Sequence, residues 1–111
     1  MSRKLRRIRF NNNERNIHSP AYVEWRQKVY DRDRHKCQWP GCNSKKNLNA
    51  HHIRRWATYP MLRFEVGNGI TLCKYHHDKV QSREEEFVVL FTGILARKLI
   101  EKIKKHAKHN P

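Results

Sequence analysis

Four potential metal ligands, arranged as two short pairs, restrict the fold more than any other feature of this sequence. Cys37 and Cys42 are separated by four residues. Cys73 and His76 follow thirty residues later and are separated by two. Zinc binds four thiolate or imidazole ligands in a tetrahedron, and two turns that each present two side chains can supply them. We therefore predict a closed, structural site that holds one Zn²⁺.

A metal cross-link would compensate for the small core that the composition allows. Only 37% of the 111 residues are hydrophobic, which is enough for one compact domain but below the globular average. The three cysteines cannot all pair as disulfides, so a reducing compartment, the cytoplasm, is expected. Free structural thiols in a cytosolic fold are the alternative to metal ligation.

Basic residues dominate the charge of the chain. Lys and Arg number 25 against 10 Asp and Glu, which gives a formal net charge of +15 at pH 7 with neutral histidines. Such an excess favours a polyanionic partner, most often nucleic acid, although an anionic membrane surface would attract it too. No apolar run is long enough to cross a bilayer and none follows Met1, so we expect neither a membrane protein nor a secreted precursor.

The hydrophobic pattern predicts an α+β domain with a helix on either side. Ser19 and Pro20 have the form of a helix N-cap followed by proline at the first position, and the helix should end near Arg34. Its apolar face consists of Tyr22, Trp25 and Val29. Further along, we expect a turn over 37–42, strands over 48–53 and 69–73, and helices over 74–81 and 83–108. The expected organisation is a mobile basic arm over 1–18, a domain over 19–82 and an amphipathic C-terminal helix over 83–111.

A second group of residues that can carry chemistry consists of His51, His52, Asn68 and His77. Neighbouring residues on a strand point to opposite faces, so the two adjacent histidines cannot serve one role. One of them could bind a metal while the other activates water beside it, if the strand end is twisted. The alternative is that each is a core or surface histidine without chemistry. The spacing of the pair to Asn68 and His77 favours a site.

The order of these residues resembles the HNH endonuclease family. The chain reads Ala50-His-His-Ile53 and then Asn68-Gly-Ile-Thr-Leu-Cys-Lys-Tyr-His-His77. The family has a His-His or Asp-His pair, an Asn, and a cysteine knuckle ending in His. The segment 31–37 also resembles the family's approach to its first knuckle. The likeness covers residues 19–82, and small proteins of this kind with a basic arm look most like those of phages and prophages.

The resemblance implies a zinc-stapled ββα-metal fold, similar to a treble clef, with two antiparallel strands and a helix around one divalent cation. In that fold His51 and His77 bind the catalytic cation, which would be Mg²⁺, Mn²⁺ or Ni²⁺. His52 is the general base, and Asn68 orients the loop that carries it. The implied activity is hydrolysis of phosphodiester bonds in duplex DNA, by nicking or double-strand cleavage, with 5′-phosphate and 3′-hydroxyl products. In phage relatives such enzymes are linked to genome packaging beside the terminase.

The sequence departs from the family pattern at three points. The first pair is Cys37-x4-Cys42 rather than Cys-x2-Cys, and the Pro-Gly dipeptide between them can absorb the extra residues. His76 stands where a fourth cysteine is usual. Gln81 stands where some relatives have a further histidine, so the catalytic cation would have two protein ligands and bind weakly without DNA.

Arginines are the expected phosphate contacts. Arg54, Arg55 and Arg63 lie in or beside the loop between the two catalytic motifs and are the first candidates. The second set, in the basic arm, is Arg3, Arg6 and Arg7. Neutralising about six phosphates would give a slope of roughly −5 for log affinity against log salt. Each arginine could instead be a solvated charge, and without a base-reading motif we expect low sequence specificity.

Two other functions fit part of the pattern. A zinc-stapled DNA-binding module without catalysis would need the zinc ligands and the basic arm, but not the histidine pair, Asn68 or His77. A nuclease or toxin that acts on RNA is also compatible, because phosphate contacts do not identify the sugar. Three loop aromatics could stack on bases, although we expect them to fill the core: Trp56, Tyr59 and Phe64.

Overall fold

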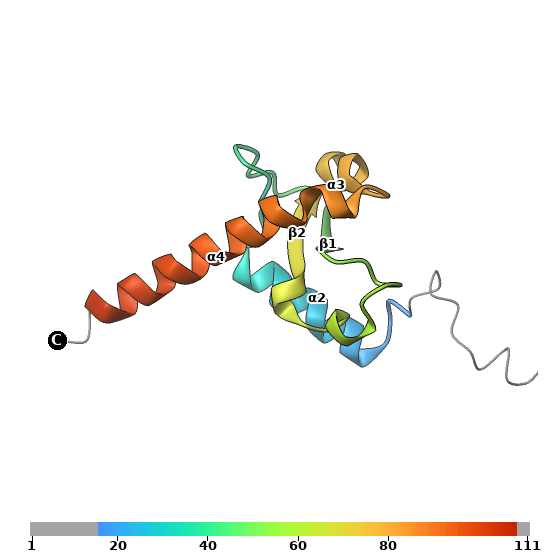
Figure 1. The fold of residues 1–111 in the computed structure, drawn as a ribbon, viewed down its shortest axis with the longest axis horizontal. Coiled ribbons are helices and arrows are strands. Elements are labelled where there is room, and N and C mark those ends of the chain that lie inside the picture. The colour runs from blue at the N-terminus through green and yellow to red at the C-terminus, as the bar shows by residue number, and fades with distance from the viewer. Residues whose placement is uncertain (1–15, 109–111) are drawn as a thin grey trace, which may run out of the picture.

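The computed structural model describes residues 16–108, and within them three helices accompany a two-stranded antiparallel sheet (Figure 1). In chain order the elements are α2 (Pro20–Arg32), β1 (Leu48–His52), the 3₁₀ turns η1 (Pro60–Leu62) and η2 (Val66–Asn68), β2 (Gly69–Cys73), α3 (Lys74–Val80) and α4 (Glu84–Lys108). The predicted α+β class and the order of the elements are confirmed. Of the predicted basic arm, residues 1–15 lie outside the described part of the chain.

Helix α2 begins where the sequence predicts. The Ser19 hydroxyl accepts a hydrogen bond from the Tyr22 amide at 3.3 Å, and Pro20 occupies the first position, where no amide donor is needed. The helix ends at Arg32, two residues earlier than predicted, because residues 34 and 35 have φ angles of 56° and 55° that a right-handed helix cannot contain. The buried residues of α2 are the predicted ones, Tyr22, Trp25 and Val29.

The hairpin of β1 and β2 lies between two layers of helix. His51 pairs with Ile70, and His52 pairs with Gly69. Alternation along β2 sends Ile70 and Leu72 into a core with α3 and α4, while Gly69 faces α2. All five residues of β2 are buried because both of its faces are covered. Strand β1 ends at residue 52, one residue before the predicted end.

Helix α2 approaches the hairpin most closely at Gly69. A Cβ atom at this position would lie 2.6 Å from Trp25 Cζ2 and 2.6 Å from Val29 Cγ2. Both neighbours are themselves buried and cannot give way, so glycine is needed for α2 to pack here. The close approach brings the Trp25 indole to the end of the hairpin, beside His52.

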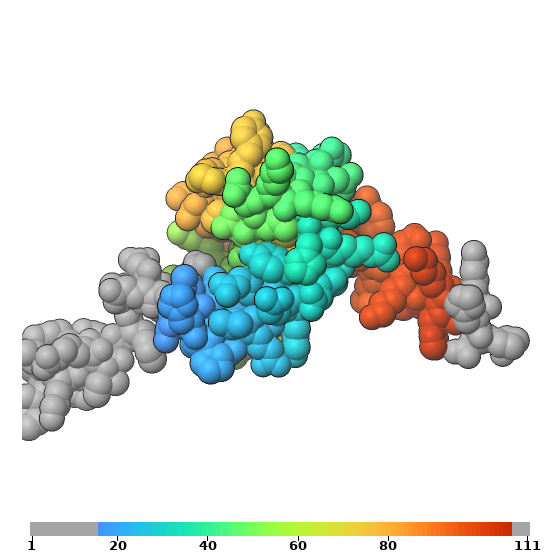
Figure 2. Space-filling view, turned by 180° about the vertical axis from the view of Figure 1, so that it is seen from behind, coloured from blue at the N-terminus to red at the C-terminus, as the bar shows by residue number. Residues whose placement is uncertain are grey.

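Helix α3 follows β2 without a loop and ends at Val80, and α4 begins after a break at Ser82, whose φ is 71°. The first half of α4 packs on the core through Val88 and Phe91. Its second half extends beyond the body of the domain (Figures 1 and 2), where apolar residues 99, 100 and 103 are exposed. The predicted long helix is confirmed. Across residues 16–108, no helix combines the length and apolar character that a bilayer-spanning segment requires.

An ion pair between half-buried Arg32 and buried Asp33, at the C-terminal end of α2, joins three segments. Asp33 is 1% exposed and accepts two hydrogen bonds from the Arg32 guanidinium, at 2.8 and 2.9 Å. The Thr71 amide donates to the same carboxylate at 2.9 Å. Arg32 also donates to the carbonyls of Val66 and Gly69. The pair therefore ties α2 to β2 and to η2, and no sequence pattern points to it.

Candidate metal centre and active site

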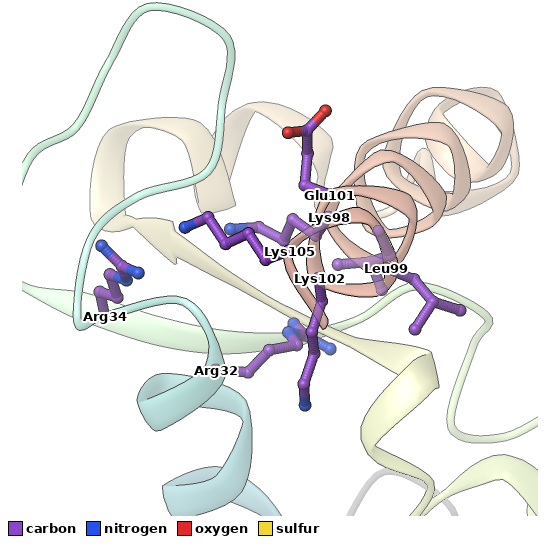
Figure 3. Close-up of a pocket in the computed structure, with 8 residues that line it drawn as sticks. Arg32, Arg34, Lys98, Leu99, Glu101, Lys102 and Lys105 are labelled. Carbon is purple, nitrogen blue, oxygen red and sulfur yellow. The ribbon is translucent and has the colours of Figure 1, made fainter. Parts of the chain in front are cut away.

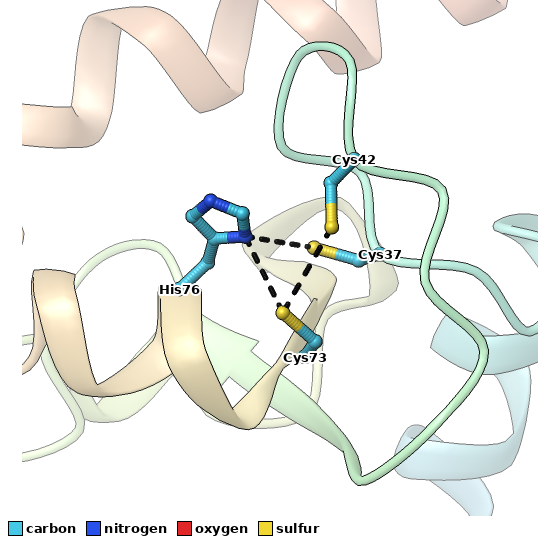
Figure 4. Close-up of side chains that lie close together, drawn as sticks. All are labelled: Cys37, Cys42, Cys73 and His76. Atoms are coloured by element: carbon cyan, nitrogen blue, oxygen red, sulfur yellow. Dashed lines mark hydrogen bonds between the residues drawn. The ribbon is translucent and has the colours of Figure 1, made fainter.

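Four side chains from two distant segments meet in one group (Figure 4). One ligand atom from each of Cys37, Cys42, Cys73 and His76 lies within 4.8 Å of all the others. The Sγ atoms of Cys42 and Cys73 are 3.9 Å apart. His76 Nδ1 lies 3.3 Å from Cys73 Sγ and 3.6 Å from Cys37 Sγ. The structure thus brings the predicted set of four together.

The spacing of these atoms matches a tetrahedral metal site. With Zn–S about 2.3 Å and Zn–N about 2.1 Å, a tetrahedron separates two sulfurs by about 3.8 Å and a sulfur from a nitrogen by about 3.6 Å. The observed separations of 3.9, 3.6 and 3.3 Å are close to those values. Three thiols and an imidazole are a donor set that zinc accepts, so the group could hold a metal ion such as zinc.

Local structure delivers the four ligands as two pairs. Pro40 and Gly41, with a φ of 83° at the glycine, form a turn closed by a 2.9 Å bond from the Cys42 amide to the carbonyl of residue 39. This turn accommodates the wider spacing of the first pair. Cys73 is the last residue of β2 and His76 lies in the first turn of α3, so the strand–helix junction presents the second pair.

Burial and nearby dipoles set the protonation of this group. Burial raises the pKa of the Cys37 thiol to about 11, so the thiol keeps its proton at neutral pH. At Cys73 burial also raises the pKa, but hydrogen bonds from the His76 amide and the neighbouring thiols outweigh it, and the pKa is lowered overall. Burial and the charge of Lys79 lower the pKa of His76, which favours the neutral imidazole that binds metal.

The hairpin and α3 bring His51 and His77 together. Their ring centroids are 5.7 Å apart, with the planes at 75°. Phe91 of α4 packs edge-on against His51 at 5.6 Å, and His51 is only 4% exposed. Two imidazoles on one metal ion have centroids on the order of 5 Å apart, given a metal–nitrogen distance of about 2.1 Å. The observed separation is somewhat longer than this, and the two rings are neighbours beside the hairpin.

His52 lies on the opposite face of β1 and is enclosed by aromatic rings. It stacks on Trp25 with centroids 4.0 Å apart, and Trp56 meets it edge-on at 5.4 Å. His52 Nε2 is 2.9 Å from the carbonyl oxygen of Arg63. A carbonyl can only accept, so Nε2 donates and Nδ1 is the acceptor nitrogen of the neutral ring. The ring is 3% exposed.

The Asn68 side chain braces the loop between the strands. Its Oδ1 accepts from the Arg54 amide at 2.8 Å. Its Nδ2 donates to the carbonyls of Arg54 and Leu62, both at 3.2 Å. These three bonds to backbone groups hold the chain directly after His52, so Asn68 is situated to orient that loop.

The loop arginines predicted to contact phosphates make contacts within the chain. Arg63 donates from Nε to the Trp56 carbonyl at 2.8 Å, and its guanidinium lies 4.5 Å from the centroid of that indole. Arg54 lies over a tyrosine ring of the same loop, and Arg55 Nε is 3.6 Å from the Glu84 carboxylate. DNA would have to compete with these contacts. The other predicted contacts, Arg3, Arg6 and Arg7, lie outside the described residues.

Comparison of the chain with protein-family models, with curated proteins and with solved structures gives no match to any of them. The resemblance to HNH enzymes therefore depends on the residues quoted from the sequence.

The sequence did not predict the aromatic side chains that pack against the Cys37 ligand group and against His52. Trp39 stacks on His76 with centroids 4.6 Å apart. Trp25 is recognisable in the sequence as part of the apolar face of α2, but its contact with a histidine 27 positions away has no sequence signal. Among the loop aromatics expected in the core, Trp56 packs on the α2 face, whereas Phe64 is exposed.

Proposed function

We propose that this chain is a metal-dependent DNA endonuclease of the HNH kind, which hydrolyses phosphodiester bonds to leave 5′-phosphate and 3′-hydroxyl ends. In this proposal β1, β2 and α3 form a ββα-metal core, and the Cys37 group is a treble-clef-like zinc staple. The observation that carries the proposal is the packing of the His51 and His77 rings, whose centroids are 5.7 Å apart, together with the loop after His52 that Asn68 braces. A purely structural zinc domain has no need of this combination.

His51 and His77 are the proposed donors for the catalytic cation. Imidazole nitrogen suits Mn²⁺ and Ni²⁺, whereas Mg²⁺ would retain most of its water. When bound, a divalent cation neutralises the charge that develops on the phosphate and on the leaving oxygen. Because the position of a third histidine is occupied by Gln81, phosphate and water have to complete the coordination, and cation affinity should rise when DNA binds.

His52 is the proposed general base. The Arg63 carbonyl keeps the proton on Nε2, which leaves Nδ1 to take a proton from the attacking water. Nδ1 is buried, Trp25 and Trp56 enclose the ring, and His51 packs on the other face of β1, so catalysis would require this end of the hairpin to open and twist.

Duplex DNA is the proposed partner. The net charge of +15 supports a polyanion, and Arg54, Arg55 and Arg63 would have to leave their present contacts to bind phosphates. A role in phage genome packaging beside a terminase, in the cytoplasm of a bacterial host, follows from the resemblance alone.

A zinc-stapled DNA-binding module without catalysis is the second candidate. The burial of His52 and its stacking on Trp25 favour this candidate, because a general base needs access to water. In such a module His51, His52 and His77 would be core histidines that pack between the helices.

Nicking of supercoiled plasmid DNA separates the two candidates. The wild type, His52→Ala and His77→Ala are compared with added Mg²⁺, Mn²⁺, Ni²⁺ or EDTA, and His18→Ala, at an exposed position, is the control. The endonuclease proposal expects metal-dependent nicking that persists in the control and falls about 100-fold or more in His52→Ala while DNA binding persists. Zinc content and circular dichroism verify that each variant is folded.

Two results would count against catalysis. Full nicking by folded His52→Ala would remove the general-base assignment. A wild-type chain that binds DNA but cuts it with none of the metals would favour the binding module.

A further inference from the structure

A half-open hollow of about 690 Å³ lies between the C-terminal end of α2 and the second half of α4 (Figure 3). Leu95 and Leu99 contribute apolar lining. Its cationic lining residues are Arg32, Arg34, Lys98, Lys102 and Lys105. The single carboxylate in the lining belongs to Glu101, which extends in a different direction from Lys98 and Lys105 (Figure 3).

One face of α4 changes from apolar to basic as the helix leaves the core. Phe91 and Leu95 pack on the domain core. Three, seven and ten residues after Leu95 come Lys98, Lys102 and Lys105, a spacing that keeps them on the same face. The part of this face that lies over the domain is therefore a packing surface, and its continuation is the basic wall of the hollow.

Much of this positive charge is not compensated by carboxylates among residues 16–108. Arg32 is held by Asp33, and Lys98 Nζ lies 3.9 Å from the same carboxylate. In the described part of the chain, by contrast, Arg34, Lys102 and Lys105 have no carboxylate within ion-pair distance. Three like charges around one hollow repel each other, and an anion that entered it would relieve this repulsion.

We propose that this hollow binds the sugar–phosphate backbone of duplex DNA, and this inference takes its partner from the proposed function. The helical rise sets Lys98 and Lys105 about 10 Å apart along α4, so the cations form a row that suits a linear polyanion better than one phosphate ion. The leucines allow the lysine stems to lie on apolar surface while the ammonium groups point to the ligand.

Helix α4 contacts both the hollow and the candidate active site. Phe91 contacts the His51 ring, and Lys98 lies two helical turns, about 10 Å, further along α4. DNA held at the lysines of the hollow would therefore lie on the helix that also packs against His51. Lys102 and Lys105 can bind phosphate without breaking an ion pair to another described residue, whereas the loop arginines must first break their contacts inside the chain.

Duplex binding measured by fluorescence anisotropy in EDTA tests the hollow independently of cleavage. The variant Lys102→Gln/Lys105→Gln is compared with Lys45→Gln/Lys46→Gln, which removes the same charge from exposed positions outside the hollow. We expect the hollow variant to lose about tenfold in affinity and to flatten the salt dependence by about 2 in log–log slope, since each lost phosphate contact removes about 0.9. The control should change much less, and Lys102→Arg/Lys105→Arg should retain binding.

Equal losses in the two Gln variants would overturn the proposal, because net charge alone would then explain the binding. Wild-type protein that binds anionic phosphatidylserine vesicles but not duplex DNA would overturn it as well. The failure of the hollow and the failure of the proposed function have different signatures. If the wild type nicks DNA and the lysine substitutions leave DNA affinity unchanged, only the proposal about the hollow is refuted. If these lysines are needed for DNA binding but the wild type does not nick DNA, only the endonuclease proposal is refuted.

Discussion

The imidazole of His52 lies flat on the indole of Trp25, with the ring centroids 4.0 Å apart and the planes 12° from parallel. This contact joins β1 to α2, and it orients the histidine that the resemblance makes a general base. Trp25 is held in turn by a 2.8 Å hydrogen bond from its Nε1 to the Glu65 carbonyl. A helix outside the hairpin therefore determines how His52 is presented.

Truncation of Trp25 should destabilise the domain strongly. Trp25→Ala removes a fully buried ring and leaves a cavity, which we expect to lower the free energy of unfolding by about 3–5 kcal/mol. Trp25→Phe keeps an aromatic ring beside His52 but loses the bond to Glu65, and should cost less, although the smaller ring also packs less well. Urea denaturation measures both changes. Equal stability of the Ala and Phe variants would contradict a packing role for this ring.

Gly69→Ala should disrupt the approach of α2 to the hairpin. The added methyl group would meet Trp25 and Val29 at 2.6 Å, so we expect a loss of about 2 kcal/mol or more. Gly93→Ala is the matched control, because a Cβ there has no atom within 4 Å and alanine favours a helix interior by about 1 kcal/mol. Thermal denaturation should thus move in opposite directions for the two variants. A neutral Gly69→Ala would show that the helix can shift away.

Asn68→Ala should loosen the loop after His52. Three backbone groups of Arg54 and Leu62 lose their partner, and we expect about 2–3 kcal/mol of destabilisation. Hydrogen exchange of the Arg54 amide should accelerate specifically. Asn49→Ala, which removes only an exposed hydrogen bond, is the control and should change little. Unchanged exchange at Arg54 would contradict the bracing role.

Zinc should bind with one ion per chain, and its removal should unfold the domain. A chelator is expected to lower the thermal midpoint sharply, because the stability that zinc binding adds to the folded state is lost when free zinc is removed. Binding must displace the proton of Cys37, whose pKa is raised to about 11, so affinity should increase with pH. The increase is about tenfold per pH unit for each proton released. Competition titrations on either side of neutrality measure this slope, and a slope of zero would exclude ligation through Cys37.

Several features of the site are predictable because they depend on local periodicity. Alternation on a strand places His51 and His52 on opposite faces, and the structure has His51 against Phe91 and His52 against Trp25. The Pro-Gly sequence before Cys42 predicts the turn that forms there. The ligand group of Cys37 is predictable from spacing because two closely spaced pairs can supply the four ligands of a tetrahedral site.

Contacts between segments far apart in the chain had no such signal. Asp33 reads as one more polar residue near the end of a helix, yet it is 1% exposed and binds Arg32 and the Thr71 amide. The early end of α2 depends on positive φ angles at Arg34 and the following histidine, and arginine is not a typical residue for this conformation. The contact of Arg55 with Glu84 likewise joins a loop to the start of α4.

The sequence by itself determined the α+β class, the four ligands that could hold a metal and the face that each strand residue occupies, because these follow from spacing along one segment. The tertiary structure alone decided that Trp25 covers His52 and that Lys102 and Lys105 stand opposite Arg34 across a hollow. Packing is the physical reason. The partner of a buried or charged side chain depends on which surfaces come into contact when the chain folds. Periodicity within one segment does not contain that information.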